Sequence, residues 1–185
     1  MSNNRNINEV KIAISGKSGC GNTTVSRLLA DALDLRFINF TFRSLAMEKG
    51  ISLSEVLNKA AKDDWWDNEV DTRQAAMARE ARGCVLGSRL AIWVLPEADL
   101  KVFLTATPEV RAKRIQGREG ASLNDVAKFT AERDKQDHER YLRIYNINND
   151  DYSFVDIVID TAVVSPPEIV EMIIAELKKK LANSV

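Results

Sequence analysis

The sequence is poor in the residues on which several kinds of site depend. It contains two cysteines, Cys20 and Cys84, and one histidine, His138, among 185 residues. Two cysteines are too few for a disulfide framework or for a structural zinc site made of cysteines. We therefore expect both thiols to be free and no zinc centre. His138 is expected to be exposed on a helix.

Long hydrophobic runs and a net charge are missing as well. No apolar stretch approaches the about 18 residues that a membrane span needs, and the opening MSNNRNINE lacks the hydrophobic stretch of a signal peptide. We expect a cytoplasmic protein with no membrane contact. The 26 basic and 27 acidic residues give a formal net charge of −1, so no overall field recruits nucleic acid. Residues 1–185 are long enough for one domain, expected to be monomeric.

Short β-branched, apolar runs alternate with helical patterns along the chain. Strands are expected at residues 10–15, 36–40, 84–87, 100–105 and 154–160. The segment 41–82 is mostly helical. Further helices are expected after Pro108, from Ser122 to about Tyr145, and from Ser165 onward. This alternation predicts an α/β domain with about five mostly parallel strands, whose ligands bind at the carboxyl ends of the strands.

The first expected strand leads directly into the glycine-bearing segment GKSGCGNTT. It matches the phosphate-binding pattern G-x-x-x-x-G-K-[ST], except that Asn22 replaces the lysine. Glycines let backbone amides surround an anion, and the following helix directs its positive end to the same place. A glycine-rich turn without a ligand is the alternative. The residues expected to bind ATP are Gly16, Lys17, Ser18, Gly19, Cys20, Gly21, Asn22, Thr23 and Thr24.

Three side chains of this loop have expected roles. The Thr23 hydroxyl is expected to ligate Mg²⁺. Because Asn22 carries no charge, Lys17 could curl over the phosphates as a catalytic residue, or it could point into solvent. Cys20 lies near a helix N-terminus, which can lower the pKa of a thiol, but a small filler is the favoured interpretation.

Several segments, in order and spanning nearly the whole chain, resemble the cytidylate kinase family in the short form typical of archaea and some bacteria. They are ISGKSGCGNTTVSRLLADALDL, FRSLAMEKGISLSE, DTRQ, GSRLAIW, ADLKVFLTATPEVRAKRI, the REG that follows, and ERYLRIYNINNDDYSFVDIVIDT. The resemblance implies a P-loop NTPase three-layer sandwich with a helical insert that binds a nucleoside monophosphate, at about 41–82, and a small lid, at about 114–135. It also implies transfer of the ATP γ-phosphoryl to CMP or dCMP with Mg²⁺.

The sequence departs from the family's pattern at two positions. The subfamily often has threonine where this chain has Asn22, and an acidic residue is expected where it has Gly87. Without that acid, support for Mg²⁺ must come from elsewhere. These departures keep two alternatives open: a kinase of the same fold with another acceptor, and a nucleotide-binding protein without activity.

The resemblance implies that two arginines bind the α-phosphate of CMP, because a guanidinium group binds phosphate oxygens in pairs and stays charged. These are Arg43 in FRSLA and Arg89 in GSRLA. Asp71 and Arg73 are weaker candidates for recognising the cytosine edge or closing the pocket. Each of the four could instead form an ordinary surface ion pair.

The lid region is rich in arginine: Arg111, Arg114, Arg118, Arg133, Arg140 and Arg143. Phosphoryl transfer needs positive charge at the γ-phosphate and exclusion of water. Arg114, Arg118 and Arg133 are therefore the expected catalytic residues. The alternative is a solvated helix with salt bridges, to which Arg143 is assigned. The aromatic side chains of Trp65, Trp66, Trp93, Tyr141 and Tyr145 are expected to pack in the core or insert.

Overall fold

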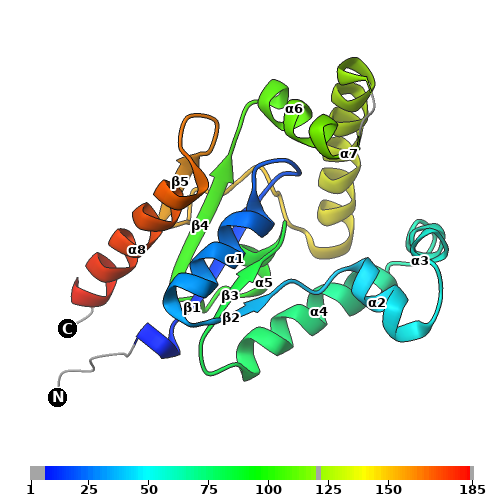
Figure 1. Ribbon diagram of the computed structural model, residues 1–185. Coiled ribbons are helices and arrows are strands. Elements are labelled where there is room, and N and C mark those ends of the chain that lie inside the picture. Colours follow the sequence, from blue (N-terminus) through cyan, green and yellow to red (C-terminus); the bar gives the residue numbers. More distant parts are fainter. Residues whose placement is uncertain (1–6, 120–121, 184–185) are drawn as a thin grey trace.

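The computed structural model describes residues 7–119 and 122–183, with only the backbone of residues 118 and 119. After a 3₁₀ turn at Ile7–Glu9, five strands form one sheet (Figure 1). They are β1 (Lys11–Gly16), β2 (Arg36–Ile38), β3 (Cys84–Gly87), β4 (Leu100–Thr105) and β5 (Ile157–Asp160). The order is β2-β3-β1-β4-β5, with every neighbouring pair parallel. This confirms the predicted α/β class.

Helices cover both faces of the sheet, which makes three layers (Figure 1). On one side lie α1 (Asn22–Leu33) and α8 (Pro166–Asn183), and on the other α4 (Trp65–Glu80) and α5 (Ala91–Val94). Along β1, Ile12 and Ile14 pack toward α1 and α8, while Ala13 packs toward α5. Because both faces of the sheet are covered at its centre, β1, β3 and β4 are buried almost continuously, whereas the edge strand β5 alternates, with Val158 exposed.

A small helical subdomain is inserted between β2 and β3, within the predicted range 41–82. It consists of α2 (Phe42–Lys49), α3 (Leu53–Ala60) and the first half of α4, packed around Leu45, Val56 and Trp66. Side-chain caps begin the first two helices: Ser44 N donates to Thr41 Oγ1 at 3.3 Å, and Glu55 N donates to Ser52 Oγ at 3.1 Å.

Two helices form an arm beside the carboxyl ends of the strands (Figure 1). They are α6 (Pro108–Glu119) and α7 (Leu123–Tyr145), joined by a small apolar cluster of Ala112, Ile115 and Val126. The predicted lid range falls inside this pair. Of the REG segment, Gly120 lies outside the described part of the chain, and Arg118 and Glu119 end α6.

The structure corrects three details of the sequence prediction. The second strand ends at Ile38 and the fifth begins at Ile157, because Phe40 packs into the insert and the segment before Ile157 carries aromatic packing. His138 is half-buried, since α7 packs against the loop before β5, where His138 Nδ1 lies 2.8 Å from Asn149 Oδ1.

The expectation of free cysteines is confirmed, and so is that of packing for two of the tryptophans. Both cysteines are free and buried. Trp66 is buried in the insert and Trp93 packs against Phe103, as expected, whereas Trp65 contacts Trp66 edge to face but is 44% exposed. Within residues 7–119 and 122–183, none of the helices combines the length and the hydrophobicity of a membrane span.

Candidate active site

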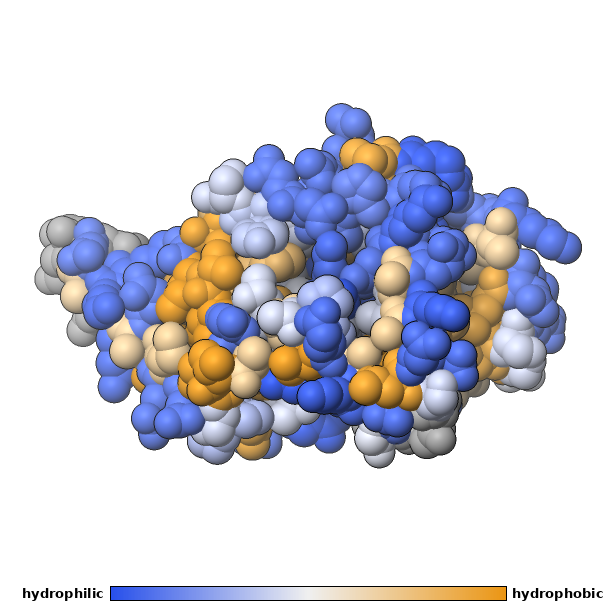
Figure 2. All heavy atoms as spheres, turned by 90° about the horizontal axis from the view of Figure 1, so that it is seen from above, coloured by the Kyte–Doolittle hydropathy of each residue, from blue (hydrophilic) through white to orange (hydrophobic). Residues whose placement is uncertain are grey.

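A cavity of about 830 Å³ opens where β1 and β3 end, and it extends from the glycine loop to α4 and α7. Figure 2 views the molecule from this side and shows a surface that is hydrophilic over much of its area and hollowed near its centre. The volume lies in the upper part of the range of small-molecule sites, about 300–1,000 Å³. Space for a ligand is therefore present at the predicted edge of the sheet.

The main chain of the glycine loop forms one end of the cavity. Residues 17–24 all line it. Gly19 and Gly21 have φ of 87° and 97°, the left-handed region that favours glycine, and a side chain at Gly19 would come 2.9 Å from Arg111 Cβ. Gly21 precedes the first residue of α1, so the positive end of that helix faces the cavity. This is the arrangement of an anion site.

Asn22, the residue that replaces lysine, points back across the loop. Its Nδ2 donates to Gly16 O at 2.5 Å, and its Oδ1 is buried without a hydrogen-bond partner. The side chain therefore ties the loop to the end of β1 and brings no positive charge to the cavity. Gly16 contributes its carbonyl to this bond.

Lys17 lies at the edge of the cavity, in an ion pair with Asp150 at 2.7 Å. Asp150 also lies 3.2 Å from His138 Nδ1. The Asp150 side chain is 52% exposed, and ion pairs at exposed sites contribute little. The Lys17 side chain therefore lies at the cavity edge in a weak ion pair, and a bound phosphate could replace Asp150 as its partner.

Two arginines of α6 donate hydrogen bonds to main-chain carbonyl oxygens of the glycine loop. Arg111 Nη1 donates to Ser18 O at 3.1 Å, and both of its Nη atoms bond the Asp134 carboxylate. Arg114 donates to Gly19 O at 3.3 Å and to the carbonyl oxygen of Thr161 at 2.6 Å. Sequence reasoning missed the Arg111–Asp134 pair, because its loop partner is remote in sequence.

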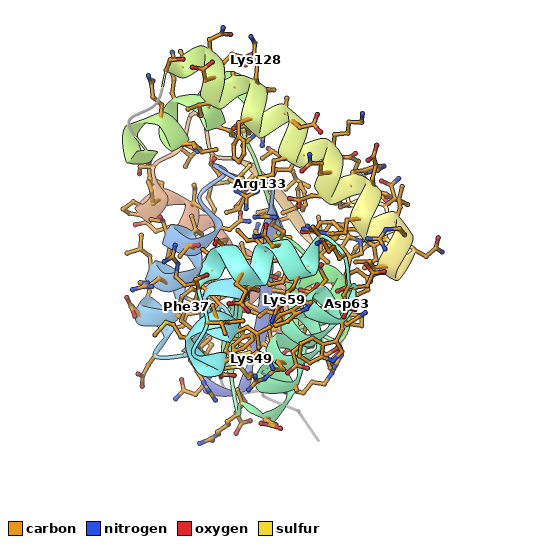
Figure 3. The ribbon with its side chains drawn as sticks, turned by 90° about the vertical axis from the view of Figure 1, so that its right-hand side faces the viewer. Phe37, Lys49, Lys59, Asp63, Lys128 and Arg133 are labelled. Atoms are coloured by element: carbon orange, nitrogen blue, oxygen red, sulfur yellow. The ribbon has the colours of Figure 1, made fainter. Side chains whose placement is uncertain are left out.

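A second pair of guanidinium groups faces the cavity itself. Arg89 Nη1 donates to Asp137 Oδ2 at 2.6 Å, whereas Arg133 makes no hydrogen bond or ion pair within the described part of the chain. Figure 3 shows Arg133 on α7, directed into the space between that helix and the sheet. Burial, and then the nearby Arg89, lower the pKa of Arg133. Two cations close together and partly buried are suited to an anion between them.

The other predicted arginines lie elsewhere. Arg43 is exposed and does not line the cavity. Arg73 turns toward α2, where it pairs with Glu48 and Glu69. On helix α4, residues at spacings of three and four share a face, so Arg73 points away while Asp71 lines the cavity. Arg118 lies in α6, but its side chain is outside the described residues.

The far end of the cavity is built from side chains of α4 and α7. Asp71 accepts hydrogen bonds from Tyr145 OH at 2.8 Å and from Gln74 Nε2 at 2.5 Å. Asp67 pairs with Arg140, whose Nε lies 3.3 Å from Asp67 Oδ1. Tyr145 therefore does more than pack, and this corrects the prediction for it.

Sequence reasoning missed most of this end. Tyr141, expected only to pack, is buried and lines the cavity. Asp67 and Gln74 of α4 were also missed; they line the cavity four residues before and three residues after Asp71, which was a predicted candidate. That spacing on a helix next to a buried face was the one sequence pattern that could have indicated them.

Burial dominates the electrostatics of these carboxyl groups. It raises the pKa of Asp71 to about 6, partly offset by the hydrogen bonds from Tyr145 and Gln74. It also raises the pKa of Asp67, with Arg140 acting in the opposite direction. Acidic groups held in this way are typical of sites that function with a ligand.

The residues fit a magnesium ion only together with bound phosphates. Within the described ranges, no group of three or more His, Cys, Asp or Glu side chains could hold a metal. Thr23 is exposed at the cavity, and Asn39 Nδ2 lies 3.4 Å from its hydroxyl. A side chain at Gly87 would collide with Ser26 Oγ, so no acid fits there without rearrangement. Mg²⁺ commonly takes few protein ligands and completes its shell with phosphate and water.

The sheet order, the glycine loop at the end of β1 and the arginines facing it define a P-loop kinase fold. Solved structures share it. A shikimate kinase from Bacteroides thetaiotaomicron aligns with a TM-score of 0.62 at 16% identity, over 94% of this chain and 98% of that one. A deoxyadenosine kinase from M. mycoides with bound dATP aligns with a TM-score of 0.57 at 16% identity, over 91% of this chain and 100% of that one.

Comparison with known sequences identifies the family within the P-loop kinase fold. The model of the cytidylate kinase-like family matches residues 11–163, and the chain belongs to this family. Cytidylate kinase 2 of Borreliella burgdorferi is 48% identical over 92% of this chain and 97% of its own length. The cytidylate kinase of Pyrococcus horikoshii is 40% identical over 84% of this chain and 81% of its own.

Proposed function

We propose that the protein is a cytidylate kinase, which transfers the γ-phosphoryl of ATP to CMP or dCMP. The observation that carries this proposal is one cavity with two unlike ends: a main-chain phosphate loop and a pocket of polar side chains, with Arg89 and Arg133 at the cavity. A phosphotransferase needs two substrates side by side with cations between them. Membership of the cytidylate kinase-like family supports the choice of acceptor.

At the loop end, we assign the triphosphate of ATP to the amides of residues 17–24 and to the start of α1. Arg111 and Arg114 bond the carbonyl oxygens of Ser18 and Gly19. Cys20 N donates within the loop, to Lys17 O at 3.1 Å, so the other amides of the loop are left to the ligand. Arg114 is then a positioning residue more than a direct partner of phosphate. The Thr23 hydroxyl would hold a Mg²⁺ ion that enters with the nucleotide, and that ion would neutralise part of the phosphate charge.

At the centre, Arg89 binds the acceptor phosphate, and Arg133 stabilises the group in transfer. Arg89 is held by Asp137, while Arg133 has no protein partner to give up among the described residues. The acceptor phosphate is already a nucleophile at neutral pH, so the protein needs no general base; its contribution is position and charge. Arg118 and Arg43 stay predictions. Arg43 follows Phe42, which lines the cavity, but the Arg43 side chain is exposed outside the lining.

Coupled measurement of ADP formation with CMP, dCMP, UMP and AMP tests the proposal. We expect CMP and dCMP to give the highest kcat/KM. A higher value with UMP or AMP would make the protein a kinase of another nucleotide. Light scattering on the purified chain tests the predicted monomer.

A specific observation favours a second candidate function. Asn22 brings no charge to the phosphates, and Ser26 leaves no room for an acid at Gly87. A nucleotide-binding protein without turnover would have the same features. Tight ATP binding with no ADP formed in the presence of any of the four monophosphates would support this candidate and contradict the kinase.

A further inference from the structure

The cavity wall formed by α4 contains buried oxygen atoms without hydrogen-bond partners. Gln74 is 1% exposed and Asp67 is 4% exposed, and neither Gln74 Oε1 nor Asp67 Oδ2 has a partner in the described structure. Both residues line the cavity. A buried acceptor without a donor is unfavourable, and in native proteins it is rare away from functional sites. These atoms indicate a ligand that presents donors to α4.

The orientation of the Gln74 amide is fixed by its neighbours. Gln74 Nε2 donates to Asp71 Oδ1 at 2.5 Å, and the other oxygen of Asp71 accepts from Tyr145 OH at 2.8 Å. Turning the amide over would place Gln74 Oε1 against a carboxylate oxygen, and two acceptors repel each other. The carbonyl oxygen is therefore held on the side away from Asp71, where it has no partner.

We propose that Gln74 determines acceptor specificity by accepting a hydrogen bond from the exocyclic amino group of the base, and that Asp71 and Tyr145 are positioning residues for it. The proposal rests on the function proposed above and deepens it. Cytosine carries an amino group at C4, where uracil carries a carbonyl oxygen. Uracil would set that oxygen against Gln74 Oε1 and leave both acceptors buried and unpaired.

Sites built to hydrogen-bond a substrate group discriminate strongly against an analogue that lacks it. The amino group can be removed without changing the rest of the ring, because the pyrimidin-2-one ribonucleoside monophosphate is CMP with hydrogen at C4. Calorimetric titration of the full chain compares this analogue, CMP and UMP. We expect CMP to bind about 10 to 100 times more tightly than the analogue, and UMP to bind no better than the analogue.

A ratio near one in the unmodified protein would overturn the proposal without any variant. In Gln74→Leu, the ratio should fall to about one through weaker CMP binding, with the analogue little affected. The matched control is Gln136→Leu, because Gln136 is exposed on α7, bonds Glu132 and does not line the cavity. It should keep the ratio of the unmodified protein.

Two further variants test the positioning residues. Asparagine at position 71 can donate to Gln74 or accept from it, so Asp71→Asn should lower the ratio several-fold without abolishing it. Tyr145→Phe should act in the same direction and less strongly. An unchanged ratio in both would overturn the positioning role and leave that of Gln74 intact.

ADP formation separates this inference from the proposed function. If CMP is phosphorylated but Gln74→Leu keeps the ratio, only the specificity assignment is wrong. If CMP neither binds nor is phosphorylated, the proposed function itself is wrong.

Discussion

The two ends of the cavity are built in different ways. At the loop end, main-chain groups bind, and Arg111 and Arg114 hold them from behind through the carbonyl oxygens of Ser18 and Gly19. At the α4 end, side chains bind, and two of them keep buried oxygen atoms without a partner. In the loop end the unpaired buried oxygen, Asn22 Oδ1, belongs to a side chain that ties the loop to β1, whereas in the α4 end the unpaired oxygens belong to the side chains assigned to the ligand. Affinity for phosphate and choice of acceptor therefore reside in different parts of the molecule.

The largest expected effect concerns the centre, where the two ends meet. Arg133→Ala should lower kcat about 100- to 1,000-fold with little change in ATP affinity, because the guanidinium group acts on charge that develops during transfer. Steady-state kinetics and ATP titration measure the two quantities.

Arg143, another arginine of α7, provides a matched control for Arg133. Arg143 is exposed and pairs with Asp64 at 2.5 Å, outside the cavity lining, so Arg143→Ala should keep both values. Loss of ATP affinity alone in Arg133→Ala would contradict the assignment.

The next prediction concerns the stability of the α4 end. The pKa of Asp71 rises from 3.8 to about 6 on folding, chiefly through burial, so its charged form is unfavourable in the folded state. The folded state then loses stability as pH rises from about 4 to about 6, and the penalty is complete above that. Asp71→Asn should raise the free energy of unfolding at pH 8 by up to about 3 kcal/mol.

Urea denaturation at pH 8 and at pH 4 checks this. The gain should vanish at the lower pH, where both forms of the residue are neutral in the folded state. Equal gains at both pH values would show that charge is not the cause. The same substitution should weaken acceptor discrimination, so stability and specificity should change in opposite directions.

A smaller effect is expected at the loop end. Lys17→Ala should lower kcat about tenfold, because the side chain supplies part of the charge that Asn22 does not. Lys135→Ala serves as the control, since Lys135 is exposed on α7 near Glu139, at 3.9 Å. An unchanged rate in Lys17→Ala would mean that Lys17 only pairs with Asp150.

The smallest effect is a pH dependence of acceptor choice. Below about pH 6, Asp71 is protonated and can donate as well as accept, so it no longer fixes Gln74. Its other charged or titratable neighbours are Tyr145, Asp67 and Arg140. The CMP-to-UMP ratio of kcat/KM should fall a few-fold between pH 8 and pH 5.5, and Asp71→Asn should remove that dependence. A ratio that is flat in the unmodified protein would argue against the orientation mechanism.

The same contrast explains what could be predicted from the sequence. The strand, loop and helix around Gly16 to Thr24 follow one another directly, so local patterns were sufficient. The α4 end depends on contacts such as Tyr145 with Asp71, which are 74 residues apart, and no local pattern encodes them.

Of the four residues that the family resemblance assigned to CMP binding, two line the cavity and two do not. Arg89 and Asp71 do line the cavity, whereas Arg43 and Arg73 do not. The faces of α2 and α4 decide which side chain points inward, and a motif quoted as a string of letters does not contain that orientation. Burial and pairing partners, which set the pKa of Asp71, were likewise absent from the sequence patterns.

Transfer of label from [γ-³²P]ATP tests the central claim most directly, because it follows the phosphoryl group itself. With CMP and Mg²⁺ present, we predict that the label appears in CDP at the rate at which ADP forms. Label released only as inorganic phosphate, or retained in ATP that is nevertheless tightly bound, would contradict a kinase that joins the two ends of this cavity.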